Sequence, residues 1–471
     1  MCIYTKKKKS TNIITLPKIL TEILENLIAA DLKPVLVGGC IRDFYLKTVC
    51  KDYDIEVYGN DDLVDLELNL EKFGTVVLAG KSFGVLKLSC EGYEFDFSLP
   101  RTEVKIGSGH QGFEVRTNGQ LDFKEAARRR DFTINAMGYD YTNKTFLDPY
   151  NGQEDIKNKV LRHIDDRTFV EDPLRVYRAV QFSARFEFSL DKRTFALCKD
   201  LVNKNQLEEL AKERVFEEIK KLLLKAKRPS LGFTIIKDLG ILKYFPQLEV
   251  LIGCLQEKEY HPEGDVWIHT LMCLDEMAKL RSKDEYRNLY LMLAVLCHDF
   301  GKPTTSSIIK GKITSRNHEK EGLKPTIEFI QLLSNEKKLL EKILPLVQHH
   351  LAPFQLYLQS SSLKAVKRLA TKVNIEDLCI VCLADCKGRT IPNKEKCDHA
   401  IKWLLDNAKE AKVHKEKIKA LVMGADLISM GFKPNPLFST ILEYAYDLQL
   451  EHENYSKEKL LDLILKNFQR N

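Results

Sequence analysis

The amino-acid sequence predicts an α+β protein whose N-terminal part carries a small mixed sheet and whose remainder is helical. Before residue 148, one helical segment is followed by short runs of alternating apolar and polar residues, the pattern of half-buried strands. After residue 148, apolar residues recur almost everywhere at helical spacing. The 471 residues are enough for about three domains, and 44% hydrophobic with 30% charged residues excludes a mainly disordered chain.

The expected elements begin with a helix at 16–30. Five strands follow, near residues 35–37, 55–58, 75–78, 85–88 and 93–97. In the helical part, clusters of proline and glycine indicate boundaries near 228 and 256, and a lysine-rich segment indicates another near 410. We therefore divide the chain into a head, a neck, a connector, a second large helical domain and a tail, at residues 1–147, 148–228, 229–255, 256–410 and 411–471.

Charge and hydropathy exclude further classes of protein. Lys and Arg exceed Asp and Glu by only 6, which is too little to indicate a protein that binds nucleic acid mainly through charge. All apolar runs are shorter than the roughly 20 residues that cross a bilayer, so we expect no membrane span. The four lysines at residues 6–9 are not followed by the apolar segment of a secretory signal, which favours a cytoplasmic location.

The twelve cysteines are scattered along the whole chain. In a long chain this distribution is typical of reduced, buried thiols rather than of a disulfide framework. Cys379, Cys382 and Cys386 lie close together on an apolar helical stretch, where core packing is favoured over a zinc site because no second pair of ligands stands at finger spacing.

A glycine-rich turn is the first candidate functional feature. The predicted strand at 35–37 runs directly into Gly38 and Gly39 and then into a helical segment that contains Arg42. Glycines at such a turn let backbone N–H groups approach an anion, and an arginine can add a charged fork to phosphate. Taken alone, the same residues also fit an ordinary connection between a strand and a helix.

Paired carboxylates follow this turn. Asp52 and Asp54 stand two apart in a predicted strand, so both carboxylates point to one face. Like charges held together need a cation, and Mg²⁺ prefers carboxylate oxygens together with substrate phosphates. Asp96, on another acidic strand, is the candidate third catalytic carboxylate, although its alternation also suits any half-buried strand.

Six segments, taken in order, resemble the motif series of the class II tRNA nucleotidyltransferase and poly(A) polymerase family. They are LVGGCIRD at 36–43, KDYD at 51–54, RRRDFTINAM at 128–137, DPYNGQED at 148–155, EDPLRVYRA at 171–179 and ERVFEEI at 213–219. The resemblance implies a head of the DNA polymerase β type and a Mg²⁺-dependent enzyme. Its best-known relatives add CCA to the 3′ end of tRNA from CTP and ATP without a nucleic-acid template.

The resemblance also assigns roles to single residues. Asp52 and Asp54 would hold the catalytic metal. Asp172 and Arg175, three apart on one predicted helix and therefore on one face, would read the incoming base. A surface ion pair is the other explanation of that spacing. The remaining residues implied to bind the ribose and triphosphate are Gly38, Gly39, Arg42, Asp43, Arg130, Asp131, Asn135 and Arg178.

Histidines are concentrated in the second half of the chain, where six of the eleven fall between residues 261 and 350. An H…HD…D pattern in helices, formed here by His269, His298, Asp299 and Asp385, resembles the HD-domain metal-dependent phosphohydrolase superfamily. His318 and His350 resemble the extra ligands of two-metal members, with His349 as the alternative to His350. The resemblance implies a divalent metal of unknown identity and, as in bacterial tRNA nucleotidyltransferases with such a domain, phosphatase or 2′,3′-cyclic phosphodiesterase activity.

Several functions stay open at this point. The chemistry of the head would also suit a CC-adding enzyme, an A-adding enzyme or a poly(A) polymerase. The segment between residues 101 and 128 contains glycines suited to a mobile loop, and the resemblance implies that this loop switches the enzyme from C to A, which favours full CCA addition. A hydrolase whose head only binds RNA and a plain tRNA-binding protein are the alternatives from other classes. The sequence predicts no oligomeric state.

The small positive charge conceals an uneven distribution. Residues 51–100 carry a net charge of −7, which suits a cation site, and residues 361–420 carry +6. The resemblance to the tRNA nucleotidyltransferases places tRNA at the C-terminal third, so we expect its basic part to contact tRNA. The expected contacts are Lys364, Lys367, Arg368, Lys412, Lys415, Lys417 and Lys419.

Overall fold

The computed structural model describes residues 14–50, 52–79, 84–105, 113–391, 395–452 and 454–468. The chain divides into two compact units. Unit 1 is Met1–Ile219 with Ile235–Gly240, and unit 2 is Lys220–Thr234 with Ile241–Asn471. The five smaller regions expected from the sequence stay predictions.

A seven-stranded mixed sheet forms the centre of unit 1. Its order is β3-β4-β5-β2-β1-β8-β9. Strands β2 and β5 are parallel, whereas the other neighbours are antiparallel, which confirms the mixed sheet. The strands are β1 (Lys33–Val37), β2 (Tyr53–Tyr58), β3 (Thr75–Ala79), β4 (Val85–Cys90), β5 (Tyr93–Ser98), β8 (Gly138–Asp140) and β9 (Thr145–Leu147).

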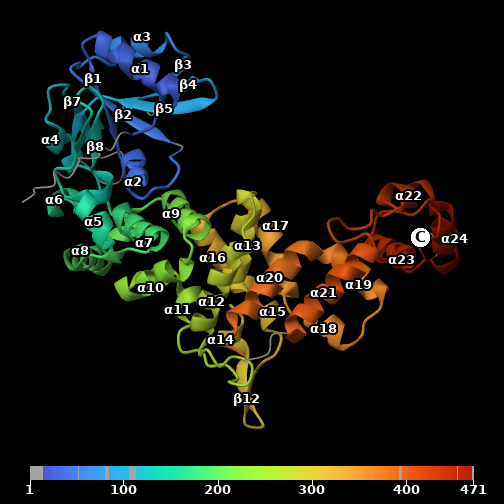
Figure 1. Ribbon diagram of the computed structural model, residues 1–471. Helices are drawn as coiled ribbons and strands as arrows, with labels where there is room; N and C mark the ends of the chain where they lie inside the picture. Colours follow the sequence, from blue (N-terminus) through green and yellow to red (C-terminus); the bar gives the residue numbers. More distant parts are fainter. Residues whose placement is uncertain are drawn as a thin grey trace, which may run out of the picture. The chain divides into compact units, whose positions relative to one another are not determined.

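Helices cover the sheet because its strands alternate apolar residues between two faces. On β1, Leu36 faces a cluster that includes α1 (Lys18–Ala29) and α3 (Leu63–Leu70), while Val35 and Val37 face Ala126 of α4 (Phe123–Arg128). Figure 1 shows α1 and α3 beside the sheet. The apolar residues of α1 recur at helical spacing and are buried, which confirms the helix expected at 16–30.

The register of the sheet positions the polar residues of the head. Val37, the last residue of β1, stands opposite Asp54 on β2, and Asp54 in turn stands opposite Asp96 on β5. Helix α2 (Gly39–Tyr45) starts directly after β1. The glycine turn and the carboxylates therefore meet at the same end of three adjacent strands.

A separate hairpin and a series of helices complete the first unit. The hairpin consists of β6 (Arg101–Lys105) and β7 (Phe113–Thr117), and residues 106–112 of the expected glycine-containing loop lie outside the described residues. The later elements are α5 (Gly152–Asn158), β10 (Val160–Leu161), α6 (Asp166–Glu171), α7 (Leu174–Phe186), β11 (Ser189–Leu190), α8 (Lys192–Asn203), α9 (Lys212–Lys225) and α10 (Pro229–Leu239), the last two of which run across the division between the units.

Unit 2 is mainly helical. Its centre is α13 (Glu285–Cys297), whose apolar residues surround the whole helix and are buried almost throughout. The other helices are α11 (Pro246–Glu249), α12 (Val266–Lys279), α14 (Lys302–Thr305), α15 (His318–Glu321), α16 (Leu323–Leu333), α17 (Lys337–His349), α18 (Ala352–Leu358), α19 (Leu363–Lys372), α20 (Ile375–Gly388), α21 (Glu395–Glu410), α22 (Gly424–Ser429), α23 (Leu437–Glu451) and α24 (Lys457–Asn467). Among the described residues, no helix has the length and apolar character that crossing a bilayer requires.

A short hairpin interrupts the helices of this unit and was not expected from the sequence. Strands β12 (Ser306–Ile309) and β13 (Lys312–Ser315) are joined by Lys310 and Gly311, both at positive φ, of 51° and 79°. Two such residues form the tight turn that matches the twist of a two-stranded hairpin. The turn at Lys310 and Gly311 could therefore be recognised locally, but the two strands are too short for their apolar and polar residues to show a clear alternation.

The cysteines depart from the expectation that all twelve are reduced. Cys386 and Cys397 form a disulfide that joins α20 to α21. Their separation of 11 residues spans the end of one helix and the start of the next, and a pairing set by helix packing cannot be recognised from spacing alone. Cys379 and Cys382 are buried free thiols.

Basic residues of α19 contact the tail of the chain. Lys364 pairs with Glu451, Arg368 pairs with Asp447, and the buried Lys367 donates to the backbone carbonyl of residue 450 at 3.3 Å. These three cations, expected to contact tRNA, are thus engaged in holding α19 against α23. Their expected contact with tRNA stays a prediction, and the sequence does not show which of these charges are paired across the fold.

Two candidate active sites

The first candidate site is a cavity of about 330 Å³ in unit 1. It brings together all of the predicted nucleotide-binding residues except Asp43, although they come from three separate segments of the chain. Asp54 and Arg214 also line it. The full lining is Gly38, Gly39, Arg42, Asp54, Arg130, Asp131, Asn135, Asp172, Leu174, Arg175, Arg178, Phe182 and Arg214.

The glycine turn is required by its backbone and by its neighbours. Gly38 has φ +71°, and a Cβ atom added there would lie 3.1 Å from Arg130 Nη1 and 3.2 Å from Asp54 Oδ2. A side chain at this position would therefore strain the backbone and crowd two polar groups of the cavity. Arg42 is buried one turn later, where its Nη1 donates to Asn135 Oδ1 at 2.7 Å and its Nη2 lies 2.8 Å from Asp43 Oδ1.

The predicted metal carboxylates are unequally exposed. Asp54 lies in the cavity, Asp52 stands just before β2 in solvent, and Asp96 is beside Asp54 but also 3.3 Å from Lys87 Nζ. Burial raises the pKa of Asp54; Asp96 and Asp52 add to that rise, whereas Arg130 opposes it. Oxygen donors that repel one another in this way fit a divalent cation.

Glu56 is a residue of this site that sequence reasoning missed. It continues the alternation of Asp52 and Asp54 along β2, but its side chain is fully buried. Its Oε1 accepts from Arg130 Nη2 at 2.8 Å and from Arg129 Nη2 at 3.1 Å, and its Oε2 accepts from the Tyr58 hydroxyl at 3.1 Å. Burial alone would raise the pKa of Glu56, but the two guanidinium groups outweigh it and hold the pKa below its ordinary value.

A second buried carboxylate holds another arginine in place. Asp131 Oδ2 lies 2.6 Å from Arg178 Nη2, and its Oδ1 accepts from Asn135 Nδ2 at 2.9 Å. Burial would raise the pKa of Asp131, yet Arg178 and the amide of Asn135 keep it low. Arg42 and Arg178 are therefore linked through Asn135 and Asp131, while Arg130 is held separately by Glu56.

Asp172 and Arg175 do not share a helix, contrary to the expectation. Helix α6 ends at Glu171, Asp172 is extended with φ −119° and ψ 98°, and α7 begins at Leu174. Pro173 explains the break, because a residue before proline avoids the helical conformation. The two side chains still line one cavity: Asp172 Oδ2 lies 3.3 Å from Arg214 Nη2, and Arg175 donates to the backbone carbonyls of Thr168 and Arg129, both at 2.6 Å.

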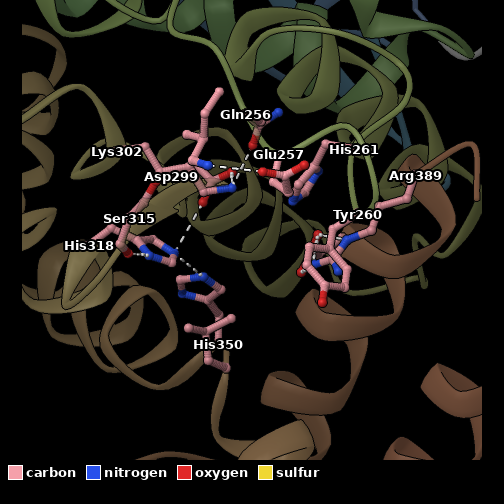
Figure 2. A pocket seen from close by; sticks show the side chains of 13 residues that line it. Gln256, Glu257, Tyr260, His261, Asp299, Lys302, Ser315, His318, His350 and Arg389 are labelled. Carbon is pink, nitrogen blue, oxygen red and sulfur yellow. Dashed lines mark hydrogen bonds and ion pairs between the residues drawn. The ribbon is translucent and has the colours of Figure 1, made fainter. Parts of the chain in front are cut away.

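The second candidate site is a cavity of about 220 Å³ in unit 2 (Figure 2). It lies where the ends of several helices converge. His269 stands on α12 and Asp385 on α20, while His298 and Asp299 follow α13, His318 opens α15 and His350 follows α17. All six are buried. The structure thus assembles every predicted HD residue, and it places His350 rather than His349 in the cluster.

These residues form two adjacent groups with the spacing of metal ligands. The first is His269, Cys273, His298 and Asp385, and the second is Asp299, His318 and His350. Asp299 lies between them, because its Oδ2 is 3.2 Å from His298 Nε2 and its Oδ1 is 3.4 Å from His318 Nε2. In Figure 2 the rings of His318 and His350 point toward one another below Asp299. A carboxylate in this position can bridge two cations.

Every histidine of the two groups is oriented by its Nδ1. Those of His298, His318 and His350 donate to backbone carbonyls at 2.7 Å, and that of His269 donates to Glu263 Oε1 at 2.8 Å. The Nε2 atoms therefore face the cluster, as in metal sites. Burial lowers the pKa of His350 to about 3, which keeps its imidazole neutral and able to bind a metal. In the described structure, no contact of His298 Nε2 or of the two Asp299 oxygens meets hydrogen-bond geometry, although Asp299 forms ion pairs with the groups around it.

Two cations stand beside the carboxylates of this cavity. Lys302 Nζ lies 2.7 Å from Asp299 Oδ2 and donates to Gln256 Oε1 at the same distance. Arg389 Nη2 lies 2.7 Å from Asp385 Oδ2. Both side chains line the cavity, so an anion that entered it would meet positive charge next to the metal-type ligands.

Removal of the Glu56 charge tests how much this residue stabilises the fold of the head. Because its pKa is lower in the folded state, its stabilisation is present above the unfolded pKa and is lost as the pH falls through the folded pKa. Glu56→Gln leaves two buried guanidinium groups without their carboxylate, so we expect a loss of about 3 kcal/mol at neutral pH that shrinks on acidification.

Hydrogen–deuterium exchange of peptides from β1 and β2 measures this change. Fluorescence does not, because both tryptophans, Trp267 and Trp403, lie in unit 2. Glu94→Gln, at an exposed carboxylate on the neighbouring strand β5, is the matched control and should leave exchange unchanged. Equal exchange in the Glu56→Gln and unmodified proteins at neutral pH would contradict the role of Glu56.

Three family models match the chain: the poly A polymerase head domain at residues 35–162, a probable RNA and SrmB-binding site of polymerase A at 187–252, and the HD domain at 266–387. The multifunctional CCA protein of Mannheimia succiniciproducens is 36% identical over 373 residues, covering 75% of this chain and 84% of that protein. That of Pseudoalteromonas atlantica is 34% identical over 364 residues, covering 75% and 85%.

Solved structures share the fold. The Bacillus stearothermophilus CCA-adding enzyme in complex with CTP has a TM-score of 0.66 at 18% identity, over 96% of this chain and 98% of that chain. The Thermotoga maritima CCA-adding enzyme complexed with tRNA has a TM-score of 0.57 at 21% identity, over 97% of each chain. With a poly A polymerase head, an HD domain and relatives above 30% identity over three quarters of its length, the chain belongs to the family of multifunctional CCA proteins.

Proposed function

We propose that this chain adds CCA to the 3′ end of tRNA, using CTP and ATP and no nucleic-acid template. The observation that carries the proposal is the cavity of unit 1, which combines a glycine turn, a metal-type carboxylate and the pair Asp172 and Arg175. The relatives are named multifunctional CCA proteins. The proposed parts are a head at 1–147, a neck at 148–228, a connector at 229–255, an HD domain at 256–410 and a tail at 411–471, in a cytoplasmic enzyme.

In the proposed reaction, the 3′-hydroxyl of tRNA attacks the α-phosphate of the nucleotide in line, and pyrophosphate leaves. The backbone at Gly38 and Gly39 and the guanidinium of Arg42 would bind the triphosphate, with Arg130 and Arg178 held by their carboxylate partners to face it. Asp52 and Asp54, with Asp96 beside them, would hold Mg²⁺, which supplies Lewis-acid stabilisation of the charge that develops on the phosphate. Because the three arginines are held in place before the nucleotide binds, they would need little reorganisation.

Asp172 and Arg175 would select the base. A carboxylate accepts from the exocyclic amine that cytosine and adenine both carry, and a guanidinium donates to a ring nitrogen or a carbonyl oxygen. In this chain the two groups are held separately, Asp172 by Arg214 and Arg175 by backbone carbonyls. Uracil and guanine offer an acceptor where the carboxylate needs a donor, so they would be rejected.

The head is tested with tRNA that lacks its CCA end. Incubation with CTP alone should add two residues, ATP alone should add none, and both together should add three. Asp52→Ala and Asp54→Ala should abolish addition, because each removes a carboxylate that binds the metal. Products are sized on a denaturing gel.

Glu94→Gln is the control for this assay, because its exposed carboxylate lies on the same sheet but outside the cavity. Extension that stops at two residues with both nucleotides present, addition from ATP but not from CTP, or growth into a long tail would instead identify a CC-adding enzyme, an A-adding enzyme or a poly(A) polymerase, respectively. Normal addition by both aspartate variants would exclude the proposed chemistry altogether.

The HD domain carries a second proposed function, a metal-dependent phosphohydrolase that acts on phosphorylated or 2′,3′-cyclic RNA ends. The observation that favours it is Asp299, which stands between two groups of buried metal ligands while Lys302 and Arg389 supply positive charge for a phosphate. The side chains Lys302 and Arg389 would orient the substrate phosphate, and the divalent cations would activate water.

Asp299→Asn separates the two activities. We expect this variant to lose release of phosphate and opening of 2′,3′-cyclic ends, since both ligand groups lose their shared carboxylate, while CCA addition continues. Phosphate release is measured by a colorimetric assay, and CCA addition by the gel assay on the same preparation. His349→Asn is the matched control, because His349 lies next to the ligand His350 but outside the cluster. Undiminished hydrolysis by Asp299→Asn would rule out this site.

The proposed tRNA contact is limited to the exposed basic residues of 412–419. Replacement of Lys412, Lys415, Lys417 and Lys419 by glutamine should weaken tRNA binding and reduce the slope of log affinity against log salt by about one unit for each phosphate contact that is lost. Filter binding over a range of salt concentrations measures the slope. Because Lys364 and Arg368 are already paired with α23, their replacement is the control and should change it less. An unchanged slope after the first set of replacements would remove this segment from the tRNA path.

A further inference from the structure

Cys273 is a buried thiol that the proposed chemistry of the HD domain does not use. It lies four residues after His269 on α12, so both side chains point to the same face of the helix. Its side chain is completely buried, and a Cβ atom added to Gly388 of α20 would lie only 2.4 Å from its sulfur. The thiol is therefore fixed between the two helices that carry His269 and Asp385.

The sulfur of Cys273 lies about as far from the ring nitrogen of His269 as two ligands of one metal ion lie from each other. Cys273 Sγ is 3.4 Å from His269 Nε2, and Nε2 is also 3.1 Å from Asp385 Oδ1. A nitrogen and a sulfur bound tetrahedrally to one zinc ion, at about 2.1 Å and 2.3 Å, are separated by about 3.6 Å. The observed separation is thus close to that of two ligands of one ion.

An independent observation points to a cation at the same place. His298 is 1% exposed, and its Nε2 faces the cluster, where Asp299 Oδ2 lies 3.2 Å away but does not meet hydrogen-bond geometry. The N–H at its Nδ1 already donates to the carbonyl oxygen of Val295. Buried polar atoms almost always make a well-directed hydrogen bond, so an imidazole nitrogen that lacks one and lies within 4.8 Å of a sulfur and a carboxylate oxygen points to a cation between them.

We propose that Cys273 is a direct thiolate ligand of the cation bound by His269, His298 and Asp385, and that this ligand makes the site select Zn²⁺, Co²⁺ or a similar cation over Mg²⁺. The inference rests on the proposed metal centre of the HD domain and adds a ligand and a metal class to it. On binding, the thiol proton leaves to solvent and the sulfur donates its electron pair to the cation. Thiolate favours such cations, whereas oxygen-only sites suit Mg²⁺.

Cobalt is the probe, because only a bound thiolate gives a sulfur-to-cobalt charge-transfer band in the near ultraviolet. The metal-free full-length protein, with its Cys386–Cys397 disulfide intact, is titrated with Co²⁺ and followed by absorption. We expect the band to saturate at a single equivalent, to vanish in Cys273→Ser, and to remain in Cys379→Ser, a buried thiol of α20 outside the cluster. Co²⁺ affinity should fall at least about tenfold in Cys273→Ser, because loss of a group that only supports a ligand already costs that much.

The outcomes separate this inference from the metal centre itself. Co²⁺ binding that is lost in Asp385→Asn but never shows a charge-transfer band would leave the centre in place and overturn the role of Cys273. Binding unaffected by Asp385→Asn, again without the band, would overturn both. If Cys273→Ser fails to fold, X-ray absorption of the unmodified protein with one equivalent of Zn²⁺ decides: sulfur at about 2.3 Å supports the proposal, and a shell of nitrogen and oxygen alone contradicts it.

Discussion

Buried carboxylates, and the positive charges that must meet them, are the constraint on which both sites depend. A carboxylate removed from water without a partner costs several kcal/mol, so the fold must bring a cation to each one. In unit 1, Glu56 and Asp131 take arginines as partners. In unit 2, Asp299 and Asp385 contact Lys302 and Arg389 but also direct oxygens toward the histidines of the cluster. The first arrangement fixes guanidinium groups, and the second leaves donors for metal.

This difference follows from where the carboxylates stand on their elements. Along β2, the alternation of side chains puts Asp52, Asp54 and Glu56 on one face, but burial increases along the strand. Asp52 is in solvent, Asp54 lines the cavity, and Glu56 is completely enclosed. The same alternation therefore leaves the carboxylates of Asp52 and Asp54 available to an ion, whereas that of Glu56 is paired with Arg129 and Arg130. How deeply a carboxylate is buried in the sheet, rather than its residue type, therefore decides whether it can bind an ion or holds arginine side chains in place.

Local sequence predicted most of the elements and, through the resemblance to a known family, most of the residues that meet in the two cavities. The helix at 16–30 and the strands of the head follow from apolar periodicity, and Gly38 follows from its place after a buried strand. The prediction that Asp172 and Arg175 share a helix was wrong, although Pro173 was a local signal against it. Glu56 and Cys273 also had local signals, a third acidic residue at strand spacing and a cysteine four residues after a ligand histidine.

Contacts between distant segments could not be predicted in this way. The Cys386–Cys397 disulfide, the pairing of α19 with α23, and the position of Asp299 between two ligand groups all depend on how helices pack. Spacing along one helix restricts which residues share a face, but it does not say which other helix that face meets. For the same reason a run of basic residues predicts charge without predicting whether the charge is available to RNA.

The HD centre shows how closely such packing must be controlled. Ligands from several helices and the residues that follow them converge there, so backbones must approach more closely than side chains normally allow. A Cβ atom at Gly301 would lie 2.0 Å from the His318 carbonyl oxygen, and a Cβ atom at Gly388 would lie 2.8 Å from the Cys273 nitrogen. These two glycines, each within three residues of a ligand aspartate, let α15 and α12 come near enough for His318, His269 and Cys273 to reach the cluster. The geometry of the proposed metal centre is therefore set largely by backbone packing.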